Sequence, residues 1–322
     1  MNQKKTVLAM IPETEEGKRR FSAAGDYRVL FAEEPTDSQL AEAEIIVGEP
    51  TMEQIHKAKR LEWLQIVFAG ADYYTQAEDY PHHITLTNMS GAYGQSISEY
   101  VLAMIFSLYK KMHLYRDQQR AEIWEDCGKE ESLVGKTVLI LGAGDIGSCV
   151  AVLTKKFDCY NIGVRRVARE VPDYLDEVHT LEELDQLLPR ADIVVSSLPE
   201  TPATRNVLSK ERIAEMKPTA ILINVGRGSA VDLDALDTAL EEGKLAGAAI
   251  DVTVPEPLPK GHPLWQCKNA ILTPHITGCC FGHLDETERK LIAICAENLE
   301  HYANGEPLIN LVDFQTGYRI TT

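Results

Sequence analysis

The feature that most constrains the fold of this chain is a glycine-rich turn that follows directly after a short apolar run. Val138 to Leu141 is a continuous apolar segment of the kind that forms a strand buried on both faces. Gly142 to Gly147 then read G-x-G-x-x-G, and Ser148 to Phe157 can form a helix. In this context the glycines allow a tight turn, a close approach of backbone to a pyrophosphate, and tight helix–strand packing. The sequence therefore predicts a dinucleotide-binding βαβ unit rather than a plain turn.

The composition is that of a globular chain with a strong negative charge. Its 322 residues are enough for two domains, and hydrophobic and charged residues make up 44% and 25%. No apolar run reaches the ~18 residues of a membrane span, so no membrane association is expected. The net charge of −17 disfavours a nucleic acid partner. Seven cysteines without zinc-like spacing favour reduced thiols in the cytoplasm, and no metal site is predicted.

The first hundred residues alternate short apolar runs with helical stretches, which predicts parallel βαβ units. Strands are expected at residues 6–11, 27–31, 45–48, 64–68 and 84–88, with helices at 13–24, 37–42 and 51–60. One long helix is expected from Ser96 to Arg120, because apolar residues recur there every three or four positions. Its length suits a helix that crosses between domains or packs against a second subunit.

The rest of the chain continues the alternation after the glycine motif. Strands are expected at residues 160–164, 192–198, 220–225, 245–251 and 270–273, and helices at 177–188, 210–216, 232–243 and 285–304. Asp232 is placed to cap its helix and Gly243 to end it.

Three polar residues come directly after three successive strands of the nucleotide unit. They are Arg227, Glu256 and His275. Because the carboxyl ends of parallel strands line the ligand crevice, we expect all three near a bound nicotinamide. An arginine can hold a carboxylate or keto oxygen, and a histidine oriented by a carboxylate is a suitable proton donor. Each residue alone has a plainer reading, as a turn cap, a surface charge or a histidine satisfied by its surroundings.

Several longer segments resemble the D-2-hydroxyacid dehydrogenase family. They are LGAGDIG, SSLPETPATRNVL, LINVGRGSAVD, AAIDVTVPEPLPKGHPLW and LTPHITG, in that order, with FAGAD and TNMSGAYGQSISEY in the first domain. The resemblance covers nearly the whole chain. It implies an α/β fold with two parallel-sheet domains and a homodimer. The flavodoxin-like substrate domain would hold residues 1–99 and 287–322, and the Rossmann dinucleotide-binding domain residues 100–286.

The resemblance also implies roles for individual residues. His275 would be the acid/base and Glu256 its partner, while Arg227 would bind the carboxylate and carbonyl of the substrate. Ala69, Gly70 and Ala71 would hold the substrate carboxylate through backbone N–H groups, although the same loop could be a plain strand-to-helix turn. Asp251 would contact the nicotinamide amide. Cofactor contacts are expected from Gly142, Gly144, Asp145, Ile146, Gly147, Arg165, Arg166, Ser197, Leu198, Pro199, Thr204, Val225, Gly226, Arg227, Asp251, His275 and Gly278. One departure is Thr253, where relatives more often carry an aromatic residue.

The residues after the second strand of the nucleotide unit bear on the choice of cofactor. An NAD enzyme of this fold needs an acidic residue there for the ribose 2′-OH. This chain has Arg165 and Arg166, with Arg169 nearby, which favours the 2′-phosphate of NADP although NAD remains possible. The alternative is that these arginines are solvated surface residues.

The sequence therefore predicts an NADP-preferring oxidoreductase that reduces a small 2-keto acid to the D-2-hydroxy acid. One rival is a cofactor-sensing binding protein, like the co-repressors of the family. Another is a formate or phosphite dehydrogenase of the same family, although a formate enzyme is expected to carry glutamine in place of Glu256. Which keto acid is reduced is not decided by the sequence.

Overall fold

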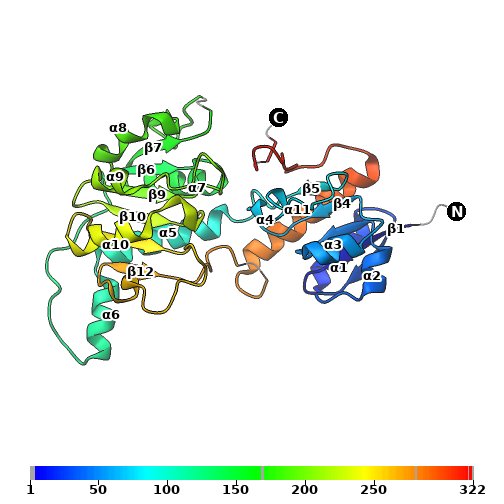
Figure 1. The fold of residues 1–322 in the computed structure, drawn as a ribbon, viewed down its shortest axis with the longest axis horizontal. Helices are drawn as coiled ribbons and strands as arrows, with labels where there is room; N and C mark the ends of the chain where they lie inside the picture. The colour runs from blue at the N-terminus through cyan, green and yellow to red at the C-terminus, as the bar shows by residue number, and fades with distance from the viewer. Residues whose placement is uncertain (1–3, 168–169, 280, 318, 321–322) are drawn as a thin grey trace. The chain divides into compact units, whose positions relative to one another are not determined.

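The computed structural model describes residues 4–167, 170–279, 281–317 and 319–320, and it divides into two compact units. The first unit comprises Met1–Tyr93 with Cys279–Thr322, and the second unit comprises Gly94–Gly278. Figure 1 shows a sheet in each unit with helices packed around it. The boundaries expected from the sequence lie six and eight residues further along the chain (99 against 93, and 286 against 278).

The sheet of the first unit has five parallel strands in the order β2-β1-β3-β4-β5. This order is the flavodoxin-like one, in which the chain reverses direction across the sheet after β1 and β2. The strands are β1 (Lys5–Ala9), β2 (Tyr27–Phe31), β3 (Ile45–Val47), β4 (Trp63–Gln65) and β5 (Thr85–Thr87). The helices are α1 (Glu15–Ala23), α2 (Asp37–Glu42), α3 (Met52–Lys57), α4 (Asp72–Thr75) and α11 (Asp285–Asn304).

A buried polar network holds α11 against this sheet. The Asn298 amide donates to Oε1 of Gln65 at 2.7 Å, and the Thr87 hydroxyl donates to the same oxygen at 2.8 Å. The Trp63 indole N–H donates in turn to the Thr87 hydroxyl at 2.8 Å. All four side chains are fully buried, so each polar group needs such a partner. The network therefore fixes where the C-terminal helix joins the first unit.

The sheet of the second unit has seven parallel strands in the order β12-β11-β10-β9-β6-β7-β8. It is the doubly wound Rossmann order with one added strand, and the order reverses between β6 and β9. The strands are β6 (Thr137–Leu141), β7 (Tyr160–Val164), β8 (Glu177–His179), β9 (Ile193–Ser196), β10 (Ile221–Asn224), β11 (Gly247–Ile250) and β12 (Ala270–Leu272). The helices are α5 (Gly94–Tyr109), α6 (Met112–Arg120), α7 (Asp145–Lys155), α8 (Leu184–Leu187), α9 (Lys210–Ala214) and α10 (Leu233–Glu241). The predicted pair of parallel-sheet domains is thus confirmed.

Continuous apolar runs form the core of the second unit. On one face of the sheet the side chains of Leu139, Val194 and Leu222 are fully buried, and on the other face those of Ile140 and Val195 are. Each such burial contributes about 1.5–3 kcal/mol. Strands buried on both faces need this continuous pattern, which is why the sequence located them. Asp232 caps α10 by accepting from the Ala235 N–H, as predicted.

The predicted helix from Ser96 to Arg120 is wrong as a single element. It is broken after α5, because Lys111 has a left-handed backbone with φ of 54°, and α6 begins at Met112. The apolar spacing continues across the break, but α6 buries none of its residues. Because α6 has no buried face, core packing does not hold it in line with α5.

The predicted helix from Glu177 to Leu188 is wrong at its start and is not continuous over the rest. Glu177–His179 forms β8 and pairs with β7, and the remainder is split into short turns and α8. A capping box at Thr180 starts the first of these turns. Pairing with the edge of the sheet has overridden the local helical preference of an acidic segment. The other predicted elements are present, with ends displaced by up to three residues.

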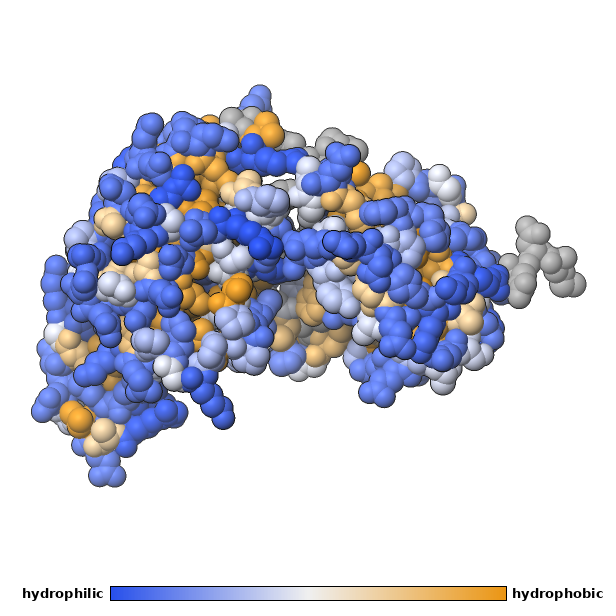
Figure 2. All heavy atoms as spheres, in the orientation of Figure 1, coloured by the Kyte–Doolittle hydropathy of each residue, from blue (hydrophilic) through white to orange (hydrophobic). Residues whose placement is uncertain are grey.

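The visible surface is largely hydrophilic (Figure 2), in keeping with the net charge of −17. In the described part of the chain, no helix has the length and apolar character needed to cross a membrane.

Candidate active site

The glycine-rich loop between β6 and α7 has the backbone geometry that its sequence requires. Gly142 has φ of +91°, a conformation that side chains rarely adopt. A Cβ on Gly147 would lie 2.4 Å from the Gly142 carbonyl oxygen, so only glycine allows α7 to pack this closely on β6. At Gly144 a Cβ would meet nothing within 4 Å, and the residue begins α7 without a side-chain cap. The first N–H groups of α7, around Asp145 and Ile146, thus fit a phosphate.

The loop after β9 packs against the glycine loop on one side and against the loop after β10 on the other. The Ser197 hydroxyl donates to the Gly142 carbonyl at 2.9 Å. A Cβ on Gly226 would lie 2.5 Å from the Leu198 carbonyl oxygen, so these two loops touch through backbone. The Thr204 hydroxyl donates to the Pro199 carbonyl at 2.6 Å and closes the first loop. The contact of Ser197 with Gly142 therefore lies between β6 and β9, where the strand order reverses, and the loop of β10, which begins at buried Val225, lies beside it.

The end of β7 carries no carboxylate. Arg165 follows the strand and its Nη2 donates to the Tyr174 hydroxyl at 3.3 Å. The Nε of Arg165 is buried and has no hydrogen-bond partner in the part of the chain that the structure describes. Arg166 is exposed, and Arg169 lies outside the described residues. An arginine with a buried, unsatisfied N–H fits a site for an anion.

Glu256 and His275 form a hydrogen-bonded pair after β11 and β12. The His275 Nδ1 lies 2.9 Å from Oε2 of Glu256, and the other Glu256 oxygen accepts from the Thr253 N–H at 2.9 Å. Both side chains remain partly exposed, at 45% for His275 and 39% for Glu256. Because Glu256 occupies Nδ1, the imidazole Nε2 is left for a ligand.

Arg227 follows β10 on the neighbouring loop. Its carbonyl accepts from the Asn224 amide at 3.0 Å, which orders the turn that carries it. A Cβ on Gly228 would lie 2.2 Å from the backbone of Thr253, so the loops of β10 and β11 pack backbone to backbone. The three residues predicted to be catalytic thus lie on adjacent loops at the carboxyl edge of one sheet, on β10, β11 and β12.

Asp251 connects these loops through a buried carboxylate. One oxygen accepts from the Thr273 hydroxyl at 2.5 Å and the Ile276 N–H at 3.0 Å. The other accepts from the hydroxyl and the N–H of Thr277 at 2.7 and 3.2 Å. The Asp251 carbonyl also accepts from the His275 N–H at 2.8 Å, which holds that residue at a φ of 52°. Asp251 therefore fixes the loop from His275 to Gly278.

The loop of Ala69, Gly70 and Ala71 lies in the first unit, between β4 and α4. The Ala69 carbonyl accepts from the Asn88 amide at 2.8 Å, and the Phe68 carbonyl accepts from the Met89 N–H at 2.9 Å. The N–H groups of the three loop residues donate to no other residue that the structure describes. This is compatible with the carboxylate site that the sequence predicts there, which stays a prediction.

Comparison with known proteins decides the family. The family model described as D-isomer specific 2-hydroxyacid dehydrogenase, NAD binding domain, matches residues 102–277, more than half of the chain. The chain belongs to this family. It is 36% identical over 241 residues to a glyoxylate reductase of Aeropyrum pernix, covering 71% of this chain and 70% of that protein. It is 31% identical over 281 residues to the mitochondrial formate dehydrogenase 2 of Oryza sativa, covering 84% and 73%. A crystal structure of a D-isomer specific 2-hydroxyacid dehydrogenase family protein from Aeromonas salmonicida is 35% identical, with a TM-score of 0.86 over 97% of this chain and 100% of that one.

Several residues that support the dehydrogenase site were not found from the sequence. The Tyr100 hydroxyl lies 2.7 Å from the Thr273 hydroxyl, which in turn donates to Asp251. Thr253, noted only as a departure from the family, holds Glu256 through its N–H. Thr273 and Thr277 flank His275, and this clustering is the only local feature of the sequence that points to their role in the site. Their partner Asp251 lies more than twenty positions away.

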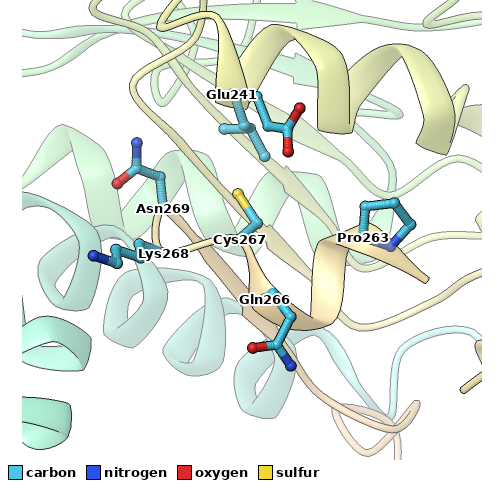
Figure 3. A pocket seen from close by; sticks show the side chains of 7 residues that line it. Glu241, Pro263, Gln266, Cys267, Lys268 and Asn269 are labelled. Carbon is cyan, nitrogen blue, oxygen red and sulfur yellow. The ribbon is translucent and has the colours of Figure 1, made fainter. Parts of the chain in front are cut away.

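A separate hollow of about 310 Å³ lies beside the residues that directly precede β12 in the sheet of the second unit (Figure 3). It is formed by the end of α10 and the segment before β12, and it is lined by Leu240, Glu241, Pro263, Gln266, Cys267, Lys268 and Asn269. Burial raises the pKa of the Cys267 thiol. None of the predicted site residues lines this hollow. Within the described ranges, no group of three or more histidine, cysteine or acidic side chains could hold a metal ion.

Proposed function

We propose that this dehydrogenase reduces a small 2-keto acid to the D-2-hydroxy acid with NADPH. The observation that carries the proposal is the 2.9 Å pair of Glu256 and His275, on loops adjacent to the one that carries Arg227. A carboxylate, an imidazole and a guanidinium at one sheet edge are the groups needed to protonate and polarise a carbonyl.

We assign the roles of the three residues from the chemistry of their side chains and from the contact between Glu256 and His275. Glu256 accepts a hydrogen bond from the Nδ1–H of His275. The Nε2 proton of the imidazolium is then the one that moves to the developing alkoxide. The guanidinium of Arg227 binds the keto oxygen and carboxylate of the substrate and stabilises the charge as it develops. When bound, the reduced nicotinamide supplies the hydride that the keto carbon accepts. The loops of β6, β9 and β10 hold the cofactor, with its pyrophosphate at the start of α7.

The substrate class rests on the loop of the first unit. We assign the substrate carboxylate to the unpartnered N–H groups of Ala69, Gly70 and Ala71. Such a loop recognises the carboxylate that all 2-keto acids share, so it does not choose among glyoxylate, hydroxypyruvate, pyruvate and larger acids. The D configuration of the product is what family membership implies.

The cofactor preference rests on Arg165 and Arg166. The absence of a carboxylate after β7 removes the group that would bind a ribose 2′-OH and repel a 2′-phosphate. The buried, unpartnered Nε of Arg165 offers a hydrogen bond to a phosphate oxygen instead. We therefore assign NADPH as the preferred cofactor.

A second copy of this chain is the proposed partner. α6 buries none of its residues, and in Figure 1 it stands away from the sheet of its own unit with the segment that follows it. That segment carries Trp124, which is 99% exposed, beside half-exposed Ile123. An exposed tryptophan next to an unpartnered helix fits burial in a homodimer.

The test of the proposed function is a panel of 2-keto acids assayed with NADPH and NADH by loss of nicotinamide absorbance. Turnover of at least one 2-keto acid, faster with NADPH, supports the proposal. Formate and phosphite are included with NADP and NAD in the oxidative direction. Turnover of either instead of any keto acid would replace the proposed reaction, and binding of NADPH without any turnover would favour a cofactor-sensing protein.

A further inference from the structure

A single tyrosine hydroxyl connects the end of β7 with the start of α7. The Tyr174 hydroxyl accepts from Nη2 of Arg165 at 3.3 Å and donates to the Ser148 hydroxyl at 3.2 Å. Ser148 lies in the first turn of α7, directly after the glycine motif. The hydroxyl therefore joins the arginine that follows β7 to the helix that begins at the phosphate-binding turn.

Tyr174 is itself held by a buried asparagine. Its carbonyl accepts from the amide of Asn161, which is fully buried on β7, at 2.9 Å. The second amide hydrogen of Asn161 goes to the Ala151 carbonyl at 2.9 Å, and its oxygen accepts from the Thr154 hydroxyl at 2.9 Å. Every polar atom of the Asn161 side chain is thus used. The backbone of Tyr174 is therefore fixed by protein contacts alone, without any ligand.

Arg165 has hydrogen-bonding capacity that the described residues do not use. Its Nε is buried without a partner, and no carboxylate of the described residues forms an ion pair with its guanidinium. A planar guanidinium binds phosphate oxygens best when its plane is already set. A hydroxyl that holds Nη2 restricts that plane before a ligand arrives.

We propose that Tyr174 and Ser148 are positioning residues that hold the Arg165 guanidinium for the 2′-phosphate of the cofactor. The inference rests on the proposed preference for NADPH. It goes further by naming Tyr174 and Ser148 as residues that set how strong that preference is. Tyr174 acts through Arg165, so its hydroxyl matters only to a ligand that carries the 2′-phosphate.

The test measures binding of two small probes to the full chain by titration calorimetry. One probe is adenosine 2′,5′-bisphosphate, which carries the 2′-phosphate, and the other is adenosine 5′-monophosphate, which lacks it. Tyr174→Phe removes only the hydroxyl and should raise the Kd of the bisphosphate about 3- to 10-fold, as expected for one lost hydrogen bond. The Kd of the monophosphate should stay within about twofold. Ser148→Ala should act in the same direction with a smaller effect.

Tyr160→Phe is the matched control. It removes the hydroxyl of a tyrosine on β7, the strand that Arg165 follows, where that hydroxyl donates to Glu177 at 2.7 Å and not to Arg165. It should change neither Kd. A second comparison places Tyr174→Phe in an Arg165→Ala background, where it should have no further effect on the bisphosphate.

The outcomes distinguish the positioning role of Tyr174 from the proposed preference for NADPH. Equal weakening of both probes by Tyr174→Phe, no weakening, or full additivity with Arg165→Ala would overturn the positioning role. If the wild-type chain binds the two probes equally, there is no 2′-phosphate site, and both the NADPH preference and this inference fail. If the wild type discriminates but Tyr174→Phe keeps the discrimination, only the positioning inference fails.

Discussion

Replacing Asp251 by asparagine should separate a structural role of this residue from a cofactor contact. The carboxylate accepts four hydrogen bonds, two on each oxygen, and each oxygen receives one backbone N–H, from Ile276 or Thr277. Asparagine keeps the shape but turns one oxygen into an N–H₂ group. The threonine hydroxyls can rotate to accept from that group, but a backbone N–H cannot. Whichever way the amide turns, one backbone N–H loses its acceptor.

The expected cost follows from that count. One hydrogen bond to a charged acceptor is worth about 1.5–3 kcal/mol, and the buried donor left behind adds to the loss. We expect Asp251→Asn to lower the free energy of unfolding by about 2–4 kcal/mol. Because the His275 loop loses an anchor, kcat should fall by about tenfold or more.

Urea denaturation followed by circular dichroism measures the first effect, and steady-state kinetics with NADPH measures the second. Asp234→Asn is the control, since that side chain on α10 is 97% exposed and should change stability by less than about 0.5 kcal/mol. If Asp251→Asn were as stable as the wild type and raised only the KM for NADPH, the loop-anchoring role would be refuted.

Four further predictions concern the proton donor, the cofactor preference, the loss of folding stability at acid pH, and the homodimer. His275→Ala should lower kcat by about 10²–10⁴-fold with little change in NADPH affinity, and near-normal kcat would remove His275 from the mechanism. Replacing Arg165 and Arg166 together by alanine should erode the NADPH preference in kcat/KM while NADH turnover stays nearly unchanged; a retained preference would contradict the arginine assignment. Hydrogen bonds from Arg190, with a further one from His179, lower the pKa of Glu177 to about 2, below its usual 4.5. Its stabilisation is therefore present above about pH 4.5 and lost as the pH falls toward 2, so Glu177→Gln should cost about 1–2 kcal/mol at neutral pH and progressively less in urea titrations at lower pH. Trp124→Glu should convert a dimer to a monomer in sedimentation velocity, and a monomeric wild type would contradict the proposed assembly.

The parts of the fold that the sequence predicted are those in which local pattern and tertiary environment agree. The continuous apolar run before Gly142 indicates a strand buried on both faces, and the glycines directly after it indicate the turn into the next helix. Arg227, Glu256 and His275 could be grouped because parallel strands place their carboxyl ends on one edge. Whether a residue lies at the carboxyl or the amino ends of the strands can thus be predicted from the order of strands along the chain.

The parts that were missed depend on contacts between distant segments. Glu177–His179 looks helical until β7 is available as a pairing partner, and no local pattern reveals that edge. Lys111 has a left-handed backbone, but a lysine, unlike a glycine, does not predict that conformation from the sequence. The contacts of Asp251 with Thr273 and Thr277, and of Tyr174 with Arg165, join residues that only the folded sheet brings together.

Isotope transfer tests the central claim most directly. The chain is supplied with NADPH carrying deuterium at the transferable C4 position and with the fastest-reduced 2-keto acid that carries a carbon substituent on its keto carbon, so that the product is chiral at C2; the product is analysed by mass spectrometry and chiral chromatography. Direct hydride transfer to the keto carbon predicts one deuterium at C2 of the D-2-hydroxy acid, and the same reaction should be slowed severely in His275→Ala. Product of the L configuration, or product without deuterium at C2, would contradict the account.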